Sequence, residues 1–156
     1  SMKHKPIEAF DLRFIQLCRR YYLPLSRFAL FIVFFWFGAL KLLGLSPASP
    51  LAEALTANTI GAQYFDVAFY GLAVFECLIG LLFLIPKATR LVIPLLFAHL
   101  ILVSSPLVLV PGMVWSNWFV PSLEGQYIIK NVALAAIAIG IAAHTEPIAV
   151  KRQRQT

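Results

Sequence analysis

Four long apolar stretches follow one another along the chain, at about residues 23–45, 66–85, 91–110 and 126–143. A helix needs about 20 apolar residues to cross the hydrocarbon core of a bilayer, and each stretch has about that length. Few polar side chains interrupt them. The pattern predicts an all-α integral membrane protein, in which residues 23–145 form one bundle of four transmembrane helices.

The residues before the first apolar stretch follow a different pattern. Apolar side chains recur there at helical spacing, while charged and amide side chains occupy the other faces; the apolar set is Ile7, Phe10, Phe14, Leu17, Cys18 and Tyr21. This arrangement predicts an N-terminal amphipathic helix within residues 1–22 that lies in the cytoplasmic-side membrane interface. A helix packed on other protein has the same pattern, so that alternative stays open.

The connecting segments carry their own signals. Ser49 and Pro50 form a helix start signal, which predicts a short helix over 51–57 on the extracytoplasmic surface, between the first two spans. Residues 111–125 form the longest predicted loop, and its aromatic side chains suit a water–membrane interface. Residues 146–156 are expected to form a basic cytoplasmic tail.

Composition excludes several classes of protein. The chain is 60% apolar and 13% charged, whereas soluble domains are about 45–50% apolar and about 25% charged. A soluble globule, a disordered tail, a nucleic-acid-binding module and a disulfide-stapled secreted domain do not fit these values. The two cysteines, Cys18 and Cys77, belong to no CxxC motif or Cys/His cluster, so we expect no metal site.

The chain has a net charge of +6, and the distribution of its basic residues predicts the topology. In the four-span arrangement, eleven of the 13 basic residues fall on one side: Lys3, Lys5, Arg13, Arg19, Arg20, Arg27, Lys87, Arg90, Lys151, Arg152 and Arg154. Because cytoplasmic segments carry an excess of Lys and Arg, we expect both termini in the cytoplasm and the two larger loops outside. The inverted topology is the alternative.

Lys41, Glu76, His99 and Lys130 are ionisable residues well inside the predicted spans. Lys41 and Lys130 fall toward the outer ends of their spans, while Glu76 and His99 fall near the midplane. Such groups usually face the bundle interior or pair with one another. We therefore expect Lys41, Glu76 and Lys130 to turn toward a common interior, as a polar site that opens outward. Further binding candidates near its mouth are Glu124, Gln126, Tyr127 and Asn131.

Each of these residues has a simpler interpretation. Either lysine can snorkel to the outer headgroups. A Glu76–lysine pair can be purely structural, and a midspan histidine such as His99 often hydrogen-bonds a neighbouring helix rather than a ligand.

Four pieces of the sequence resemble the DoxX-like superfamily of small four-span membrane proteins, and its YkgB-like (RclC-type) branch most of all. The first span ends in an aromatic-Gly-x-x-Lys pattern at 37–41, and residues 49–51 and 57–59 resemble that branch's connecting helix. Residues 76–80 follow a Glu-x-x-x-Gly pattern, and residues 122–131 resemble the opening of the fourth span. Asn131 stands where many relatives are expected to have Asp, which removes one carboxylate from the site.

The resemblance implies a protein of the bacterial inner (plasma) membrane. It carries site residues over only to Lys41, Glu76, Lys130 and the positions beside Lys130. The superfamily is functionally mixed: some members are similar to quinone-linked subunits of sulfur-oxidising enzymes, and others are associated with oxidative stress. A quinone is therefore the cofactor or ligand that the resemblance adds.

Three functions remain open from the sequence. The first is an accessory protein that holds a small molecule, lipid or partner membrane protein at the polar site without catalysing a reaction. The second is a quinone-linked oxidoreductase subunit, with lysines binding a quinol oxygen and Glu76 or His99 moving protons. The third is a small-solute or ion transporter, which would form its pore as a homo-oligomer. We favour the first, because the sequence shows no nucleophile, metal-cluster or nucleotide-binding motif.

Overall fold

The computed structural model describes residues 5–155, and helices account for most of this part of the chain. Four helical segments are long and apolar enough to cross a membrane, at Lys5–Leu42, Ala62–Phe83, Pro86–Leu109 and Leu123–Gln153. Only 17% to 28% of the most apolar part of each segment is buried inside the chain, so most of its apolar surface needs lipid to cover it. The predicted all-α, multi-pass architecture is confirmed. Residues 1–4 and 156 of the predicted N-terminal helix and basic tail lie outside the described residues.

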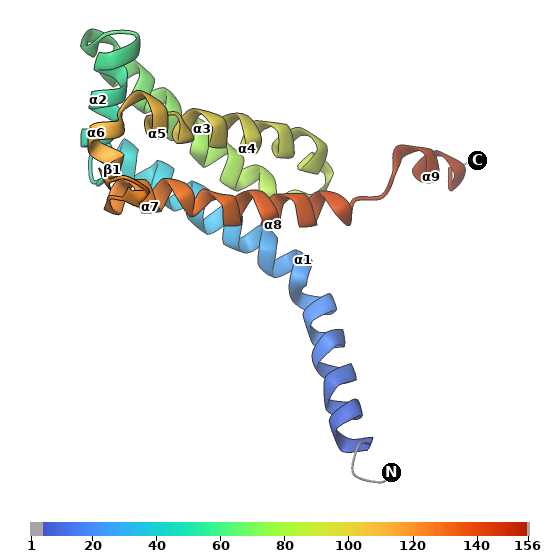
Figure 1. Cartoon of the computed structure of the whole chain (residues 1–156). Helices are drawn as coiled ribbons and strands as arrows, with labels where there is room; N and C mark the ends of the chain where they lie inside the picture. The colour runs from blue at the N-terminus through green and yellow to red at the C-terminus, as the bar shows by residue number, and fades with distance from the viewer. Residues whose placement is uncertain (1–4, 156) are drawn as a thin grey trace.

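The first span is longer than the sequence predicts. Helix α1 runs without interruption over Lys5–Leu42, through the predicted boundary at residues 22 and 23. Pro24 lies inside it and removes one backbone hydrogen bond, which a helix can absorb as a bend. The half of α1 before Pro24 leaves the bundle in a different direction from the second half (Figure 1), and its apolar side chains are exposed. Its position in a membrane interface remains a prediction.

Helices α1 and α3 (Phe65–Phe83) pack closely along each other. A Cβ atom at Gly38 of α1 would lie 2.7 Å from the Ala73 carbonyl oxygen, and one at Gly80 of α3 would lie 2.7 Å from the Phe35 backbone nitrogen. The two glycines therefore let each backbone approach the other, as small residues do in membrane helix pairs. A 3-10 turn, η1 (Ala62–Tyr64), leads into α3.

The other two spans are interrupted helices. The third consists of the turn η2 (Pro86–Ala88), α4 (Thr89–Ser104) and the short α5 (Pro106–Leu109), because Pro106 cannot continue the ladder of α4. The fourth contains α7 (Leu123–Ile129) and α8 (Asn131–Ala143), with Lys130 between them. The spans enclose an apolar core whose fully buried members include Leu30, Ile79, Phe83, Leu96 and Ile141.

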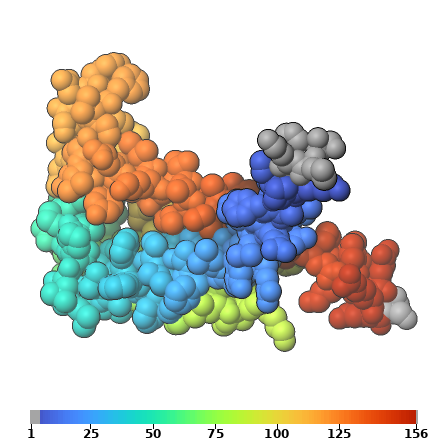
Figure 2. Space-filling model, turned by 90° about the horizontal axis from the view of Figure 1, so that it is seen from below, coloured from blue at the N-terminus to red at the C-terminus, as the bar shows by residue number. Residues whose placement is uncertain are grey.

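The segment predicted as a loop over 111–125 contains regular secondary structure instead. It contains the helical turn α6 (Pro111–Val114) and the antiparallel strands β1 (Trp115–Asn117) and β2 (Val120–Pro121). Trp115 Nε1 donates to the Leu107 carbonyl oxygen at 3.0 Å, and Ser122 Oγ donates to that of Met113 at 2.6 Å. These bonds hold the segment against the ends of its helices. Figure 2 shows this orange segment standing out from the rest of the molecule.

The two ends of the bundle carry different elements. One end carries α5, α6, the strands and α2 (Ser49–Thr59), which begins two residues before and ends two residues after the predicted short helix (Figure 1). The other end carries the α3–α4 connection and the link to α9 (Ile148–Gln153). There Arg27 donates to the Phe83 carbonyl oxygen at 3.3 Å and to Thr89 Oγ1 at 2.7 Å, which ties α1 to the connection.

Candidate functional site

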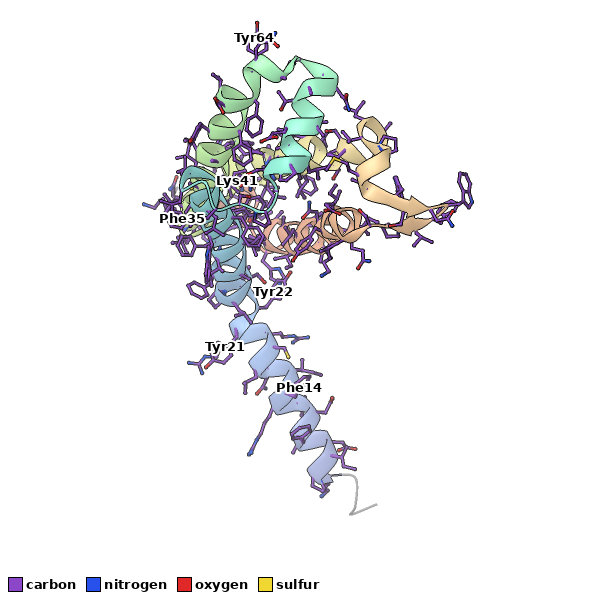
Figure 3. All side chains as sticks on the ribbon, turned by 90° about the vertical axis from the view of Figure 1, so that its left-hand side faces the viewer. Phe14, Tyr21, Tyr22, Phe35, Lys41 and Tyr64 are labelled. Carbon is purple, nitrogen blue, oxygen red and sulfur yellow. The ribbon has the colours of Figure 1, made fainter. Side chains whose placement is uncertain are left out.

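Three ionisable side chains from three spans meet inside the bundle. Lys41 Nζ donates to Glu76 Oε2 at 2.8 Å, and His99 Nε2 lies 2.8 Å from Glu76 Oε1. The side chains of Lys41, Glu76 and His99 are only 8%, 6% and 7% exposed. We call them the Lys41–Glu76–His99 cluster. In Figure 3, Lys41 lies within the bundle, whereas Phe14 and Tyr21 lie on the projecting half of α1.

Close helix packing brings the cluster together. Lys41 lies three residues after Gly38, and Glu76 lies between Ala73 and Gly80 on the face of α3 that meets α1. Residues three or four apart share one face of a helix. The small residues that bring α1 and α3 into contact therefore also direct the lysine and the carboxylate toward each other.

The histidine is the second hydrogen-bond partner of the carboxylate. If Lys41 and Glu76 form an ammonium–carboxylate pair, both oxygens of Glu76 are acceptors, and His99 Nε2 is then the donor of the second bond. The His99 ring lies edge-on to Phe34, with ring centroids 5.0 Å apart, and also contacts Phe75. Its second nitrogen, Nδ1, is buried and has no hydrogen-bond partner in the described part of the chain. In a neutral imidazole this nitrogen is an acceptor, and it is the unsatisfied position of the cluster.

Lys130 does not join this cluster, contrary to the prediction. Gly125 and Ile128 form the buried face of α7, and Lys130 lies about 200° around the helix from Ile128, at about 100° per residue. Its ammonium group is exposed and lies 5.4 Å from the centre of the Tyr127 ring. Among residues 5–155 it forms no ion pair with Glu76. An outward-directed Lys130 agrees with the snorkelling alternative, whereas the burial of Lys41 excludes it for that residue.

The remaining candidates are not buried with the cluster. Glu124, Gln126 and Tyr127 are exposed, and Asn131 is partly buried. Surface cavities lie at 115–119 and beside the α3–α4 connection, and neither is lined by the cluster, whose side chains are only 6% to 8% exposed. The polar site is therefore enclosed in this structure, and not an outward-opening pocket. No three His, Cys, Asp or Glu side chains within residues 5–155 are placed to hold a metal ion together.

Sequence reasoning placed His99 in the membrane but missed its role as the second partner of Glu76. The available signal was its predicted depth, which equals that of Glu76. Gly38 and Gly80 were used only as positions in the resemblance patterns, and their role in the close packing of two helices was not predicted, although small residues within apolar spans are a signal of it.

Comparisons with known proteins find no matching family model, no matching curated protein and no matching solved structure. The resemblance to the DoxX-like superfamily therefore stays a prediction from the sequence patterns.

Proposed function

We propose that this protein is an accessory protein of the bacterial inner membrane, which binds a small molecule, lipid or partner segment at the Lys41–Glu76–His99 cluster. The observation that carries the proposal is the enclosed ion pair with an unsatisfied His99 Nδ1 beside it. A ligand hydroxyl that donates to Nδ1 would satisfy the last acceptor of the cluster. The surrounding phenylalanines favour a ligand with an apolar body.

The energetics support a binding role over a purely structural one. Moving two ions from water into the interior of a protein costs several kcal/mol per ion. Replacing a buried ion pair by apolar side chains of similar volume often gives equal or greater stability. Ionisable residues inside membrane spans usually mark a functional site. Stability therefore gives no reason of its own for Lys41 and Glu76 to occupy the α1–α3 contact.

The proposal includes a topology with both termini in the cytoplasm. Its support is that the α3–α4 connection, Arg27 and α9 lie at the same end of the bundle. Single cysteines at Lys87 and at Glu53, in a chain without Cys18 and Cys77, would test it with a membrane-impermeant maleimide on intact cells. We expect labelling at residue 53 only; labelling at residue 87 only would invert the topology.

Small molecules that copurify with the protein test the binding function. Native mass spectrometry of the protein in nanodiscs would compare wild type with His99→Phe, which keeps an aromatic ring between Phe34 and Phe75 but removes both nitrogens. Lys130→Met is the matched control, because it removes a cation outside the cluster. We expect a bound molecule that His99→Phe loses and Lys130→Met keeps. Identical occupancy in all three proteins would refute binding at the cluster.

One observation favours the quinone-linked subunit as a second candidate. His99 connects an open acceptor, Nδ1, to the Glu76 carboxylate, so a quinol hydroxyl could donate to the ring while Glu76 receives the proton from Nε2. The second proton of the quinol and its two electrons would pass to a partner subunit. Titration with a short-chain ubiquinol tests this candidate: binding that Glu76→Gln weakens supports it, and absence of binding by the wild-type protein removes it.

A further inference from the structure

A second polar site lies at the opposite end of the spans from α2. There the α3–α4 connection and the link between α8 and α9 enclose a surface cavity of about 160 Å³. Its lining contains Pro86, Lys87, Thr89, Arg90, Thr145, Glu146 and Lys151. We call it the basic cavity. No residue of the Lys41–Glu76–His99 cluster contributes to it.

The charges of the basic cavity are unbalanced. Three cations face one carboxylate, and that carboxylate, Glu146, already pairs with Arg154 at 3.3 Å. Arg90 donates to the main-chain oxygen of Glu146. The ammonium groups of Lys87 and Lys151 have neither a hydrogen bond nor an ion pair with any described residue. The cavity therefore offers two free cations and a net positive charge to an anion.

The surroundings of the basic cavity point to a lipid as the source of that anion. Leu84, Ile85 and Leu91 flank the connection, and Ile148 opens α9; all four side chains are exposed. Cations next to uncovered apolar side chains, at the end of membrane-spanning helices, match a phospholipid, whose phosphate is charged and whose acyl chains are apolar. Basic pockets between spans bind anionic headgroups in this way.

We propose that the basic cavity binds the phosphate of an anionic phospholipid in the leaflet that this end of the bundle reaches. Lys87 and Lys151 contact the phosphate oxygens, Arg90 adds to the positive potential, and the acyl chains cover Leu84, Ile85 and Leu91. The contact holds the α3–α4 connection and the start of α9 to the membrane surface. It does not depend on the function proposed for the cluster.

Lipid competition in detergent solution tests the basic cavity. The full-length protein would be titrated with phosphatidylglycerol, with phosphatidylcholine of the same acyl chains and with inorganic phosphate, and bound lipid counted by native mass spectrometry. Each Lys or Arg near an anionic surface raises the affinity about fivefold. The double variant Lys87→Gln with Lys151→Gln should therefore weaken the binding of phosphatidylglycerol about 25-fold. Arg13→Gln with Arg19→Gln, which removes the same charge from the projecting half of α1, should change it less than about threefold.

A variant that binds the lipid more tightly controls for damage to the fold. Glu146→Gln removes the one carboxylate that residues 5–155 contribute to the cavity, and should tighten the binding of phosphatidylglycerol by about fivefold, which a misfolded variant would not do. Equal losses in the two double variants would overturn the proposal, as would equal binding of both lipids. Displacement of the lipid by inorganic phosphate at comparable concentration would identify a soluble phosphate as the ligand and would also overturn it.

Discussion

Replacing Lys41 by methionine tests the ion pair on which the cluster depends. The substitution keeps most of the length of the side chain but leaves the Glu76 carboxylate, 6% exposed, without the ammonium group 2.8 Å away. Removing one partner of a buried pair costs about 3–5 kcal/mol. His99 still donates to the other carboxylate oxygen, so we expect the lower end of this range, about 3 kcal/mol.

The measurement is the free energy of unfolding in mixed micelles, followed by far-ultraviolet circular dichroism. Adding Glu76→Gln to Lys41→Met removes the unpaired charge while keeping a hydrogen-bonding group beside His99, so the double variant should return to within about 1 kcal/mol of wild type. Lys130→Met, at an exposed cation, should change the free energy by no more than about 0.5 kcal/mol. The reasoning fails if Lys41→Met unfolds like wild type, or if the double variant is no more stable than the single one.

Three further predictions use the same unfolding measurement. Gly80→Ala should destabilise by about 1–3 kcal/mol, because its Cβ would meet the α1 backbone, whereas Gly71→Ala, with open space around it, should stabilise by up to about 1 kcal/mol; equal effects would contradict the close approach of α1 and α3. Arg27→Gln removes two bonds to the α3–α4 connection and should cost about 1–3 kcal/mol; an unchanged value would show that the connection is held by packing alone. Phe119→Gly should stabilise by about 1 kcal/mol, because Phe119 has φ +55°; a loss of stability would mean that the exposed ring contributes more than the strain costs.

The four spans could be predicted because length and hydropathy alone determine them. Each predicted apolar stretch is about as long as a bilayer is thick, and no other class of protein needs so many apolar residues in runs of this length. Element boundaries were less predictable. Pro24 is the one residue in 18–27 that signals a helix end near the predicted boundary at 22 and 23. A proline removes one backbone hydrogen bond, and α1 continues through it.

The partners within the candidate site were only partly predictable. The depth of Lys41 and Glu76 follows from counting residues along the spans, and their pairing follows from the cost of burying either charge alone. The rotation of each helix about its axis does not follow from one sequence, because all faces of a membrane span are apolar. For that reason two features of the site could not be predicted. Lys130 faces outward, and His99, from a different span, lies against the second oxygen of Glu76.

The positive charges of this chain serve different purposes according to depth. Lys41 compensates the buried Glu76 carboxylate inside the bundle, so we expect its removal to destabilise the fold. Lys87 and Lys151 lie at the end of the spans, where their ammonium groups have no partner among residues 5–155, and are available to a ligand from outside the chain. His99 lies nine residues beyond Arg90 on α4, about 14 Å along the helix. Sites more than about 7–10 Å apart without shared partners have additive effects, so lipid binding at the basic cavity and ligand binding at the cluster can be lost separately.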